Sequence, residues 1–151
     1  MRVVAGEFGG RRLKAVPGMK TRPTTDKVKE SMFNIIGPYL NGGNVLDLFG
    51  GSGGLSIEAV SRGADSATLI DRQYQAIKTI NENIEVTKSK EKFRIIKGDT
   101  NKVIFKLAKE SKFGCRFFFQ LLFVVRLVER VASFNLLLVF LLQLFQPVVG
   151  D

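Results

Sequence analysis

The sequence predicts an α/β fold built on a Rossmann-like parallel sheet, and three observations lead to this prediction. Short apolar stretches of strand length alternate with longer segments of helical periodicity. The first apolar stretch, residues 45–48, runs directly into a glycine-rich loop and then a helix. Finally, Asp47 stands at the carboxyl end of the first predicted strand, and Asp71 and Asp99 follow the second and third, which would bring the three carboxylates to one edge of the sheet.

Length and composition limit the class of protein. At 151 residues the chain predicts a single domain, and the net charge of +9 favours a polyanionic partner. The absence of histidine excludes histidine-based acid–base catalysis and most zinc sites, so we predict no metal. The one cysteine, Cys115, cannot form an internal disulfide, and residues 1–6 are too polar for a signal peptide. We therefore expect a cytoplasmic protein.

The first 18 residues predict a basic β-hairpin. Residues 1–8 and 11–16 flank a two-residue glycine turn, and this pattern is typical of paired strands. Four cations would line the hairpin: Arg2, Arg11, Arg12 and Lys14. Such a surface can contact the phosphate backbone of a nucleic acid, while the simpler interpretation is a solubilising surface.

A helix over residues 26–36 should follow. Thr24 or Thr25 can cap its start, and Gly37-Pro38 stops it. Four apolar side chains share one face, whereas two lysines lie off that face: Val28, Met32, Phe33 and Ile36 against Lys27 and Lys29.

The glycine-rich loop at residues 50–54 limits the class of ligand that the chain can bind. It is not a P-loop, because no Lys-Ser/Thr pair follows the glycines, and it lacks the dinucleotide pattern G-x-G-x-x-G. Asp47 places a carboxylate beside the loop, and this combination suits a cationic nucleoside such as S-adenosylmethionine. A strand-to-helix turn without a ligand is the alternative.

Beyond the loop the pattern continues. We predict helices over residues 53–62, 73–86 and 103–112, and strands over residues 66–70 and 93–97. Asp71 follows Asp47 at close to the interval at which an acidic residue meets a ribose in doubly wound folds. A helix N-cap is the alternative role for Asp71.

Four stretches together resemble the RsmD family of enzymes that methylate guanine N2 in 16S ribosomal RNA with S-adenosylmethionine. They are residues 2–6, 22–36, 45–54 and 57–64, and the resemblance extends to about residue 112. It implies a seven-stranded methyltransferase sheet of which this chain encodes the first half. It also implies that the partner is the small ribosomal subunit, and we expect a monomer without a membrane segment. A DNA or protein amine methyltransferase would share the pocket but has no reason to share the motif at residues 22–25.

The resemblance also implies roles for single residues. Asp47, Gly51 and Gly53 would line the methionine part of the cofactor, Asp71 would hold the ribose and Asp99 would meet the adenine amino group. Arg22 and Thr24 would close over the cofactor. The remaining cofactor-binding predictions are Phe49, Ser52 and Arg72. RNA contacts are predicted for Arg2, Arg11, Arg12 and Lys14. Gly50 stands where the family commonly has alanine, a change that should loosen the loop slightly.

The catalytic motif of such amino-methylating enzymes is missing. They carry Asp/Asn-Pro-Pro-Tyr/Phe after the fourth strand, where polar groups hold the target amine and the ring stacks on the flipped base. This chain has no Pro-Pro pair, and Pro147 is its only proline after Pro38. We therefore assign no catalytic residue. A catalytically inactive module that binds cofactor and RNA is the alternative function.

The composition changes where the motif should begin. Every lysine lies at or before Lys112, whereas most of the 13 phenylalanines lie at or after Phe113. We interpret residues 113–151 as an aberrant hydrophobic tail produced by a frameshift. A genuine hydrophobic tail is the alternative, but Arg126, Glu129 and Arg130 interrupt it, which argues against a bilayer crossing.

The frameshift interpretation makes a prediction about the gene. A single inserted or deleted base near codon 113 should restore an Asp/Asn-Pro-Pro-Tyr/Phe motif in the downstream reading frame. Resequencing the gene checks this, and the interpretation fails if no single-base change restores the motif.

Overall fold

The computed structural model describes residues 1–18 and 24–110. Arg22 and the hydrophobic tail at residues 113–151 lie outside the described residues, so the predictions made for them stay predictions. Within the described part of the chain, no helix combines the length and apolar character that crossing a bilayer requires.

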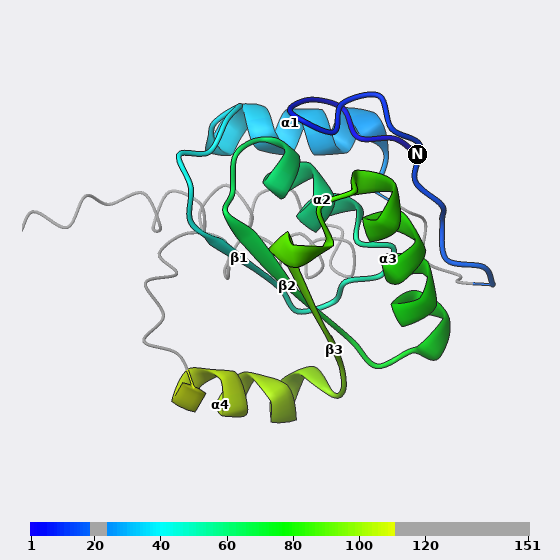
Figure 1. Cartoon of the computed structure of the whole chain (residues 1–151), viewed down its shortest axis with the longest axis vertical. Helices are drawn as coiled ribbons and strands as arrows, with labels where there is room; N and C mark the ends of the chain where they lie inside the picture. Colours follow the sequence, from blue (N-terminus) through cyan, green and yellow to red (C-terminus); the bar gives the residue numbers. More distant parts are fainter. Residues whose placement is uncertain (19–23, 111–151) are drawn as a thin grey trace, which may run out of the picture. The chain divides into compact units, whose positions relative to one another are not determined.

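Helices and strands alternate along the described chain (Figure 1). The helices are α1 (Asp26–Ile36), α2 (Gly54–Ser61), α3 (Tyr74–Thr87), the 3₁₀ turn η1 (Lys90–Lys92) and α4 (Thr100–Glu110). The strands are β1 (Asn44–Asp47), β2 (Ser66–Asp71) and β3 (Phe93–Lys97). Each helix and strand predicted between residues 24 and 110 is present, with boundaries shifted by at most a few residues.

The three strands form a parallel sheet in the order β1-β2-β3. Asp47 at the end of β1 pairs with Leu69 of β2, and Asp71 at the end of β2 pairs with Lys97 of β3. The carboxyl ends of all three strands therefore meet at one edge. This confirms the predicted fold class for the described residues.

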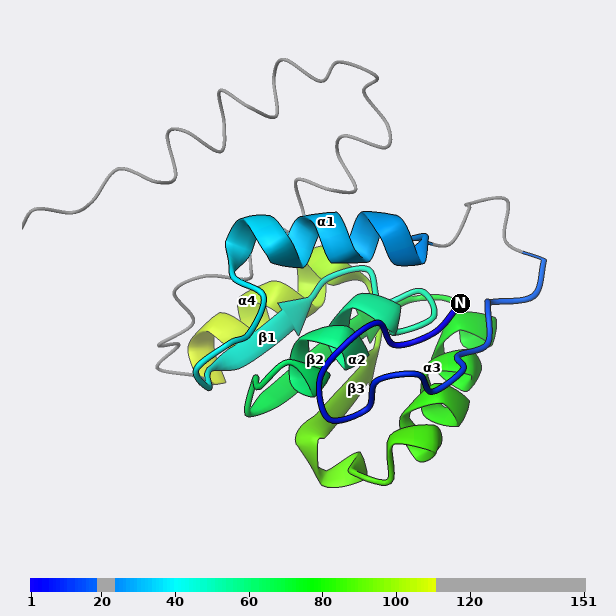
Figure 2. The same cartoon turned by 90° about the horizontal axis from the view of Figure 1, so that it is seen from above.

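Helices cover both faces of the sheet, with α2 and α3 on one side and α4 on the other (Figures 1 and 2). Alternation along the strands divides the core accordingly. Leu46, Leu48 and Ile70 pack with Leu107 of α4. On the opposite face, Leu69 lies beside Ile57 of α2 and Ile80 of α3, around the glycine loop.

The N-terminal hairpin is less regular than predicted. A single antiparallel bridge joins Arg2 to Arg12, supported by the Val3 N–H donating to the Arg11 carbonyl at 2.9 Å. Residues 5–10 form turns rather than strand ends around a two-residue turn. The side chains of Phe8 and Val3 are fully buried, so this segment is held by its packing on the helices rather than by strand pairing.

The orientation of α1 differs from the prediction. Thr25 caps the helix by accepting from the Val28 N–H, and Phe33 is buried as predicted. Lys29, predicted to lie off the buried face, is 0% exposed, whereas Val28 is 45% exposed. The apolar pattern was misleading because Lys29 has a buried anionic partner from a distant part of the sequence.

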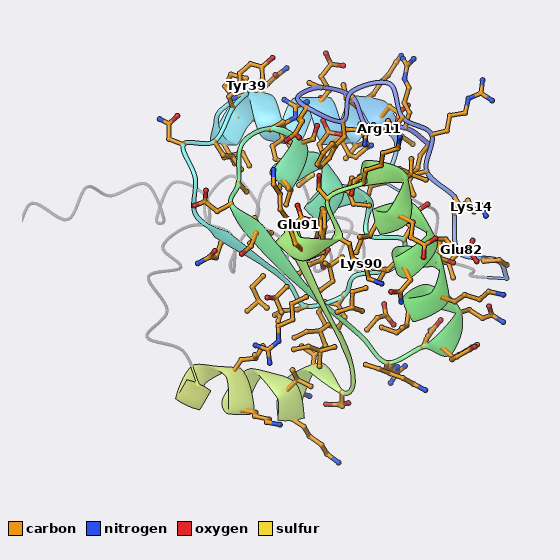
Figure 3. The ribbon with its side chains drawn as sticks, in the orientation of Figure 1. Arg11, Lys14, Tyr39, Glu82, Lys90 and Glu91 are labelled. Atoms are coloured by element: carbon orange, nitrogen blue, oxygen red, sulfur yellow. The ribbon has the colours of Figure 1, made fainter. Side chains whose placement is uncertain are left out.

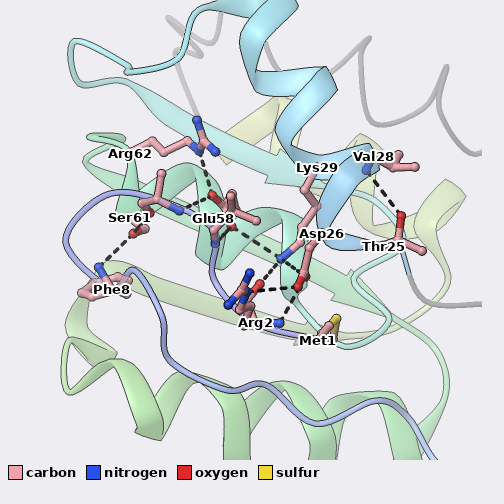
Figure 4. Close-up of polar contacts among 12 residues, drawn as sticks. Met1, Arg2, Phe8, Thr25, Asp26, Val28, Lys29, Glu58, Ser61 and Arg62 are labelled. Carbon is pink, nitrogen blue, oxygen red and sulfur yellow. Dashed lines mark hydrogen bonds and ion pairs between the residues drawn. The ribbon is translucent and has the colours of Figure 1, made fainter.

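That partner is Glu58 on α2, a fully buried carboxylate with four donors (Figure 4). Its two oxygens accept the backbone N–H groups of Val4 and Ala5 at 2.8 and 3.0 Å. The Arg62 Nε lies 2.8 Å from one oxygen and the Lys29 Nζ lies 3.5 Å from the other. Glu58 therefore joins the N-terminal segment, α1 and α2.

Neighbouring polar contacts extend the same cluster. Lys29 also donates to the Arg2 carbonyl and lies 3.5 Å from Asp26. The Arg62 guanidinium donates to the Pro38 carbonyl and stacks over the Phe33 ring at 4.7 Å. Within the described residues, no buried side-chain polar atom lacks a hydrogen-bond partner.

Replacing the central carboxylate should be costly. We expect Glu58→Gln to lower the free energy of unfolding by about 3–5 kcal/mol, because it leaves the buried Arg62 cation without its anion and the buried Lys29 cation with Asp26 alone. Urea unfolding measures the loss. Glu30→Gln, on the exposed face of α1, is the matched control and should shift the midpoint very little. Equal midpoints for the two variants would contradict this account of the cluster.

Candidate functional site

The loops at the carboxyl edge of the sheet are joined by hydrogen bonds to backbone carbonyls. The Gly50 N–H donates to the Ile70 carbonyl at 2.8 Å, which ties the glycine loop to β2. The Gly98 N–H donates to the Asp71 carbonyl at 3.0 Å, and the Thr100 hydroxyl donates to the Leu48 carbonyl at 2.7 Å. The loops after β1, β2 and β3 therefore form one connected edge.

Asp47 is the buried carboxylate of this edge. It is 4% exposed, and its oxygens accept from the Ser56 hydroxyl at 2.8 Å and the Phe49 N–H at 3.1 Å. These contacts fix the carboxylate between the end of β1 and the first turn of α2. A carboxylate held in this way is a preorganised hydrogen-bond acceptor beside the loop.

Asp71 links the glycine loop to the start of α3. Its carboxylate oxygens accept the N–H groups of Gly51 and Gln73, each at 2.9 Å. The N-cap position of α3 is Gln73, so Asp71 lies just before the cap. Each carboxylate oxygen can accept two hydrogen bonds, and the half-buried Asp71 thus retains acceptor capacity for a diol.

Asp99 stands at the same edge, beyond the end of β3. Its side chain accepts the Asn101 N–H at 3.0 Å, and its carbonyl accepts the Val103 N–H at 3.0 Å, so Asp99 organises the first turn of α4. Unlike Asp47, it is exposed. The three predicted carboxylates therefore share one edge but differ in burial.

The glycine loop requires glycine at two positions. Gly51 and Gly53 have φ values of 55° and 77°, a region that side chains disfavour. A Cβ on Gly53 would also lie 3.3 Å from the Leu69 side chain. At Gly50 a Cβ would lie 2.9 Å from the tip of Ile80, so an alanine at this position would require a small shift of that side chain.

The other predicted cofactor residues lie around this loop or beside it. Ser52 turns its carbonyl toward α3, where the buried Asn83 donates to it at 2.8 Å. Phe49 and Arg72 are exposed, and Thr24 is half-buried just before the cap of α1. The structure thus places four loop residues and two carboxylates together: Phe49, Gly51, Ser52 and Gly53, with Asp47 and Asp71.

Most of the predicted RNA-contacting residues have partners within the chain. Figure 3 labels two of them, Arg11 and Lys14, together with Glu82. Arg11 donates to the Val86 and Thr87 carbonyls at the end of α3, and Lys14 forms a 2.8 Å ion pair with Glu82. Arg2 pairs with Asp26 at 3.4 Å while 67% of its side chain stays exposed. Arg12 is exposed and forms no ion pair with any residue that the structure describes.

Three pKa shifts accompany these contacts. The hydrogen bond between Lys14 and Glu82, reinforced by their opposite charges, raises the pKa of the Lys14 ammonium and lowers that of the Glu82 carboxyl. Burial alone would raise the pKa of Asp26, but the Arg2 N–H and the Lys29 ammonium outweigh burial and lower it. All three shifts favour the ionised form of groups that attach the N-terminal segment to α1 and α3.

Comparison with known proteins decides the family. A family described as "Conserved hypothetical protein 95", which corresponds to the RsmD family, matches residues 1–118. The chain belongs to this family. Its resemblance to the RsmD family is thereby confirmed over the region that carries the glycine loop and the three edge carboxylates.

Relatives of the RsmD family match between about half and three quarters of the chain. "Putative rRNA methyltransferase YlbH" of Bacillus subtilis is 50% identical over 111 residues, covering 74% of this chain and 60% of the relative. "Ribosomal RNA small subunit methyltransferase D" of Escherichia coli is 37% identical over 89 residues, covering 59% of this chain and 45% of the relative. The chain thus spans about half the length of these relatives.

Solved structures agree with this placement. "Putative methyltransferase yhhF from Escherichia coli" superposes with a TM-score of 0.60 at 36% identity, covering 69% of this chain and 56% of that one. A hypothetical protein of Thermus thermophilus gives a TM-score of 0.65 at 25% identity, covering 73% of this chain and 62% of that one. These neighbours support the Rossmann-like methyltransferase fold.

The sequence did not predict the buried structural role of three polar residues of this RsmD family member. Glu58 lies inside a matching motif, and its spacing to Arg62 is that of a helical ion pair, but its burial follows from the apolar residues around it. Lys29 was assigned to the wrong side of its helix. Asn83 gave no signal, because a polar residue at that position of α3 also suits an exposed face.

The conformation of the glycine loop generates a prediction. Gly53→Ala should lower the free energy of unfolding by about 1–2 kcal/mol, because alanine disfavours the left-handed φ and would crowd Leu69. Gly54→Ala is the control, since Gly54 begins α2 without a positive φ and a Cβ there would meet only side-chain atoms of Met1 and Ser52. Chemical denaturation of both variants tests this, and a larger loss for Gly54→Ala would refute it.

Proposed function

We propose that this chain carries the cofactor half of an S-adenosylmethionine-dependent methyltransferase that acts on guanine N2 of 16S ribosomal RNA in the small subunit. The observation that carries the proposal is the connected edge at which Asp47 and Asp71 bond residues of the glycine loop or beside it, and Asp99 follows β3. Family membership and the names of the relatives support the RNA substrate class.

The residues at the edge fit the proposed cofactor. Asp71 keeps acceptor capacity for the ribose hydroxyls, and the exposed Asp99 can accept the adenine amino group. Asp47 provides an anion on the side of the positively charged methionine moiety, and the glycine loop allows close approach of the backbone. The cofactor would supply an electrophilic methyl group. The protein would contribute orientation and desolvation, because an amine on guanine is a weak nucleophile.

We further propose a cytoplasmic monomer whose N-terminal segment contacts ribosomal RNA. Arg12 and the outward-facing part of Arg2 are paired across the single antiparallel bridge, so their side chains lie on one side. Two cations in that arrangement suit a phosphate group. Arg11 and Lys14 are used in holding the segment on α3, and their predicted RNA contacts would add to that role.

A second candidate function is favoured by one specific observation. The Asp/Asn-Pro-Pro-Tyr/Phe motif, which would hold and stack the target base, is absent from the sequence. A chain with the cofactor edge and the basic segment but without this motif would bind cofactor and RNA without transferring the methyl group.

Calorimetry with S-adenosylmethionine tests the cofactor site. We expect saturable binding by the full chain and at least about tenfold weaker binding by Asp71→Asn, because one charged hydrogen-bond acceptor is lost. Glu85→Gln changes an exposed residue of α3, the helix that follows Asp71, and should bind like the wild type. Absence of binding by the wild-type chain would refute the proposal.

A methyl-transfer assay on unmethylated small subunits then separates the two candidate functions. Transfer of the methyl group to guanine N2 supports the enzyme, while binding without transfer supports the inactive module.

A further inference from the structure

Asn83 of α3 holds two distant parts of the chain at once. It is fully buried, and its amide nitrogen donates to the Ser52 carbonyl at 2.8 Å and to the Lys14 carbonyl at 2.9 Å. Its amide oxygen accepts the Lys14 N–H at 2.8 Å. One side chain therefore donates one hydrogen bond to the glycine loop and another to the N-terminal segment.

The start of the N-terminal segment touches the same loop. The Ser52 hydroxyl lies 3.8 Å from the Met1 sulfur, and that sulfur lies 3.3 Å from the position a Cβ on Gly54 would occupy. Lys14 is fixed once more by its ion pair with Glu82, the residue before Asn83. Residues 1–14 thus contact the loop directly at Met1 and are joined to it through Asn83 at Lys14.

A neighbouring asparagine shows that this arrangement is specific to position 83. Asn81, on the same helix, donates to the Ile77 carbonyl at 2.8 Å, a contact within one turn of α3. That contact joins nothing beyond the helix. Asn83 instead forms its hydrogen bonds with the backbone of Ser52 and of Lys14. Because the amide is fully buried, losing either partner would leave a polar atom unsatisfied. A displacement of either backbone therefore either breaks its own hydrogen bond to Asn83 or moves the side chain that also bonds the other backbone.

We propose that Asn83 is a positioning residue that couples the glycine loop to the basic N-terminal segment. The inference rests on the proposed function, because it takes the loop as the cofactor site and residues 1–14 as an RNA-contacting surface. When a ligand orders the loop, Asn83 restrains the segment, and RNA on the segment restrains the loop. Such a coupling is reciprocal by thermodynamic necessity.

Hydrogen exchange read by mass spectrometry tests the coupling in the full chain, with S-adenosylmethionine as the probe. In the wild type we expect the cofactor to slow amide exchange both in residues 50–54 and in residues 1–14. Asn83→Asp keeps the side-chain shape and the acceptor for the Lys14 N–H but loses both donors. It should retain slowing in residues 50–54 and lose it in residues 1–14.

Asn81→Asp is the matched control, because it makes the same chemical change on the same helix. It should behave like the wild type, because the Asn81 amide donates to a carbonyl of α3 itself. Asn83→Ala removes the hydrogen bonds without adding a buried charge and is measured alongside, in case Asn83→Asp does not fold. As a second readout, the affinity for a small-subunit RNA fragment should rise about fivefold or more with cofactor in the wild type and in Asn81→Asp. The rise should be absent in both Asn83 variants.

The outcomes separate the inference from the proposed function. Slowed exchange in residues 50–54 without any change in residues 1–14 of the wild type would overturn the coupling while leaving the cofactor site intact. Slowed exchange in residues 1–14 of a folded Asn83 variant would overturn the role of Asn83. No slowing in residues 50–54 of the wild type would overturn the cofactor site, and with it the inference.

Discussion

The structure depends most on one buried carboxylate, that of Glu58. A carboxylate without water is stable only when its oxygens are fully hydrogen-bonded and its charge is balanced. Here the backbone of residues 4–5 satisfies the oxygens, while Lys29 and Arg62 balance the charge. Because these partners come from the N-terminal segment, α1 and α2, the cluster requires all three to be in place together.

This constraint reaches the candidate site through α2. The helix that carries Glu58 begins at Gly54, directly after the glycine loop, and its Ser56 hydroxyl holds Asp47. The N-terminal segment is anchored to α2 near Glu58 and to α3 at Asn83. A segment that looks peripheral in the sequence therefore fixes the helices that follow the first two loops of the carboxyl edge of the sheet.

Local patterns allowed most of the fold to be predicted. Strand β3 was predicted with its observed bounds, and the parallel edge with Asp47, Asp71 and Asp99 followed from the alternation of strands and helices. The failures concern polar residues with distant partners. Helical periodicity assigns Lys29 to the surface because it weighs only neighbours on the same helix, whereas the anion that permits burial lies 29 positions away. The role of Asn83 could not be predicted for the same reason, because its partners are also distant in the sequence. The irregularity of the hairpin was not predicted because contacts with α2 replace most of the strand pairing.

The three edge carboxylates look equivalent in the sequence, yet the structure gives each a different environment. Asp47 is buried and committed to Ser56 and the Phe49 N–H, Asp71 is half-buried and shared between the loop and α3, and Asp99 is exposed at the start of α4. Desolvation strengthens an electrostatic interaction, and exposure weakens it. The edge is therefore suited to a ligand whose positive charge lies at the β1 end and whose neutral, hydrogen-bonding part extends toward β3. A cationic nucleoside with its charge at one end and its base at the other has that distribution, which is a stronger argument for the ligand class than the count of carboxylates.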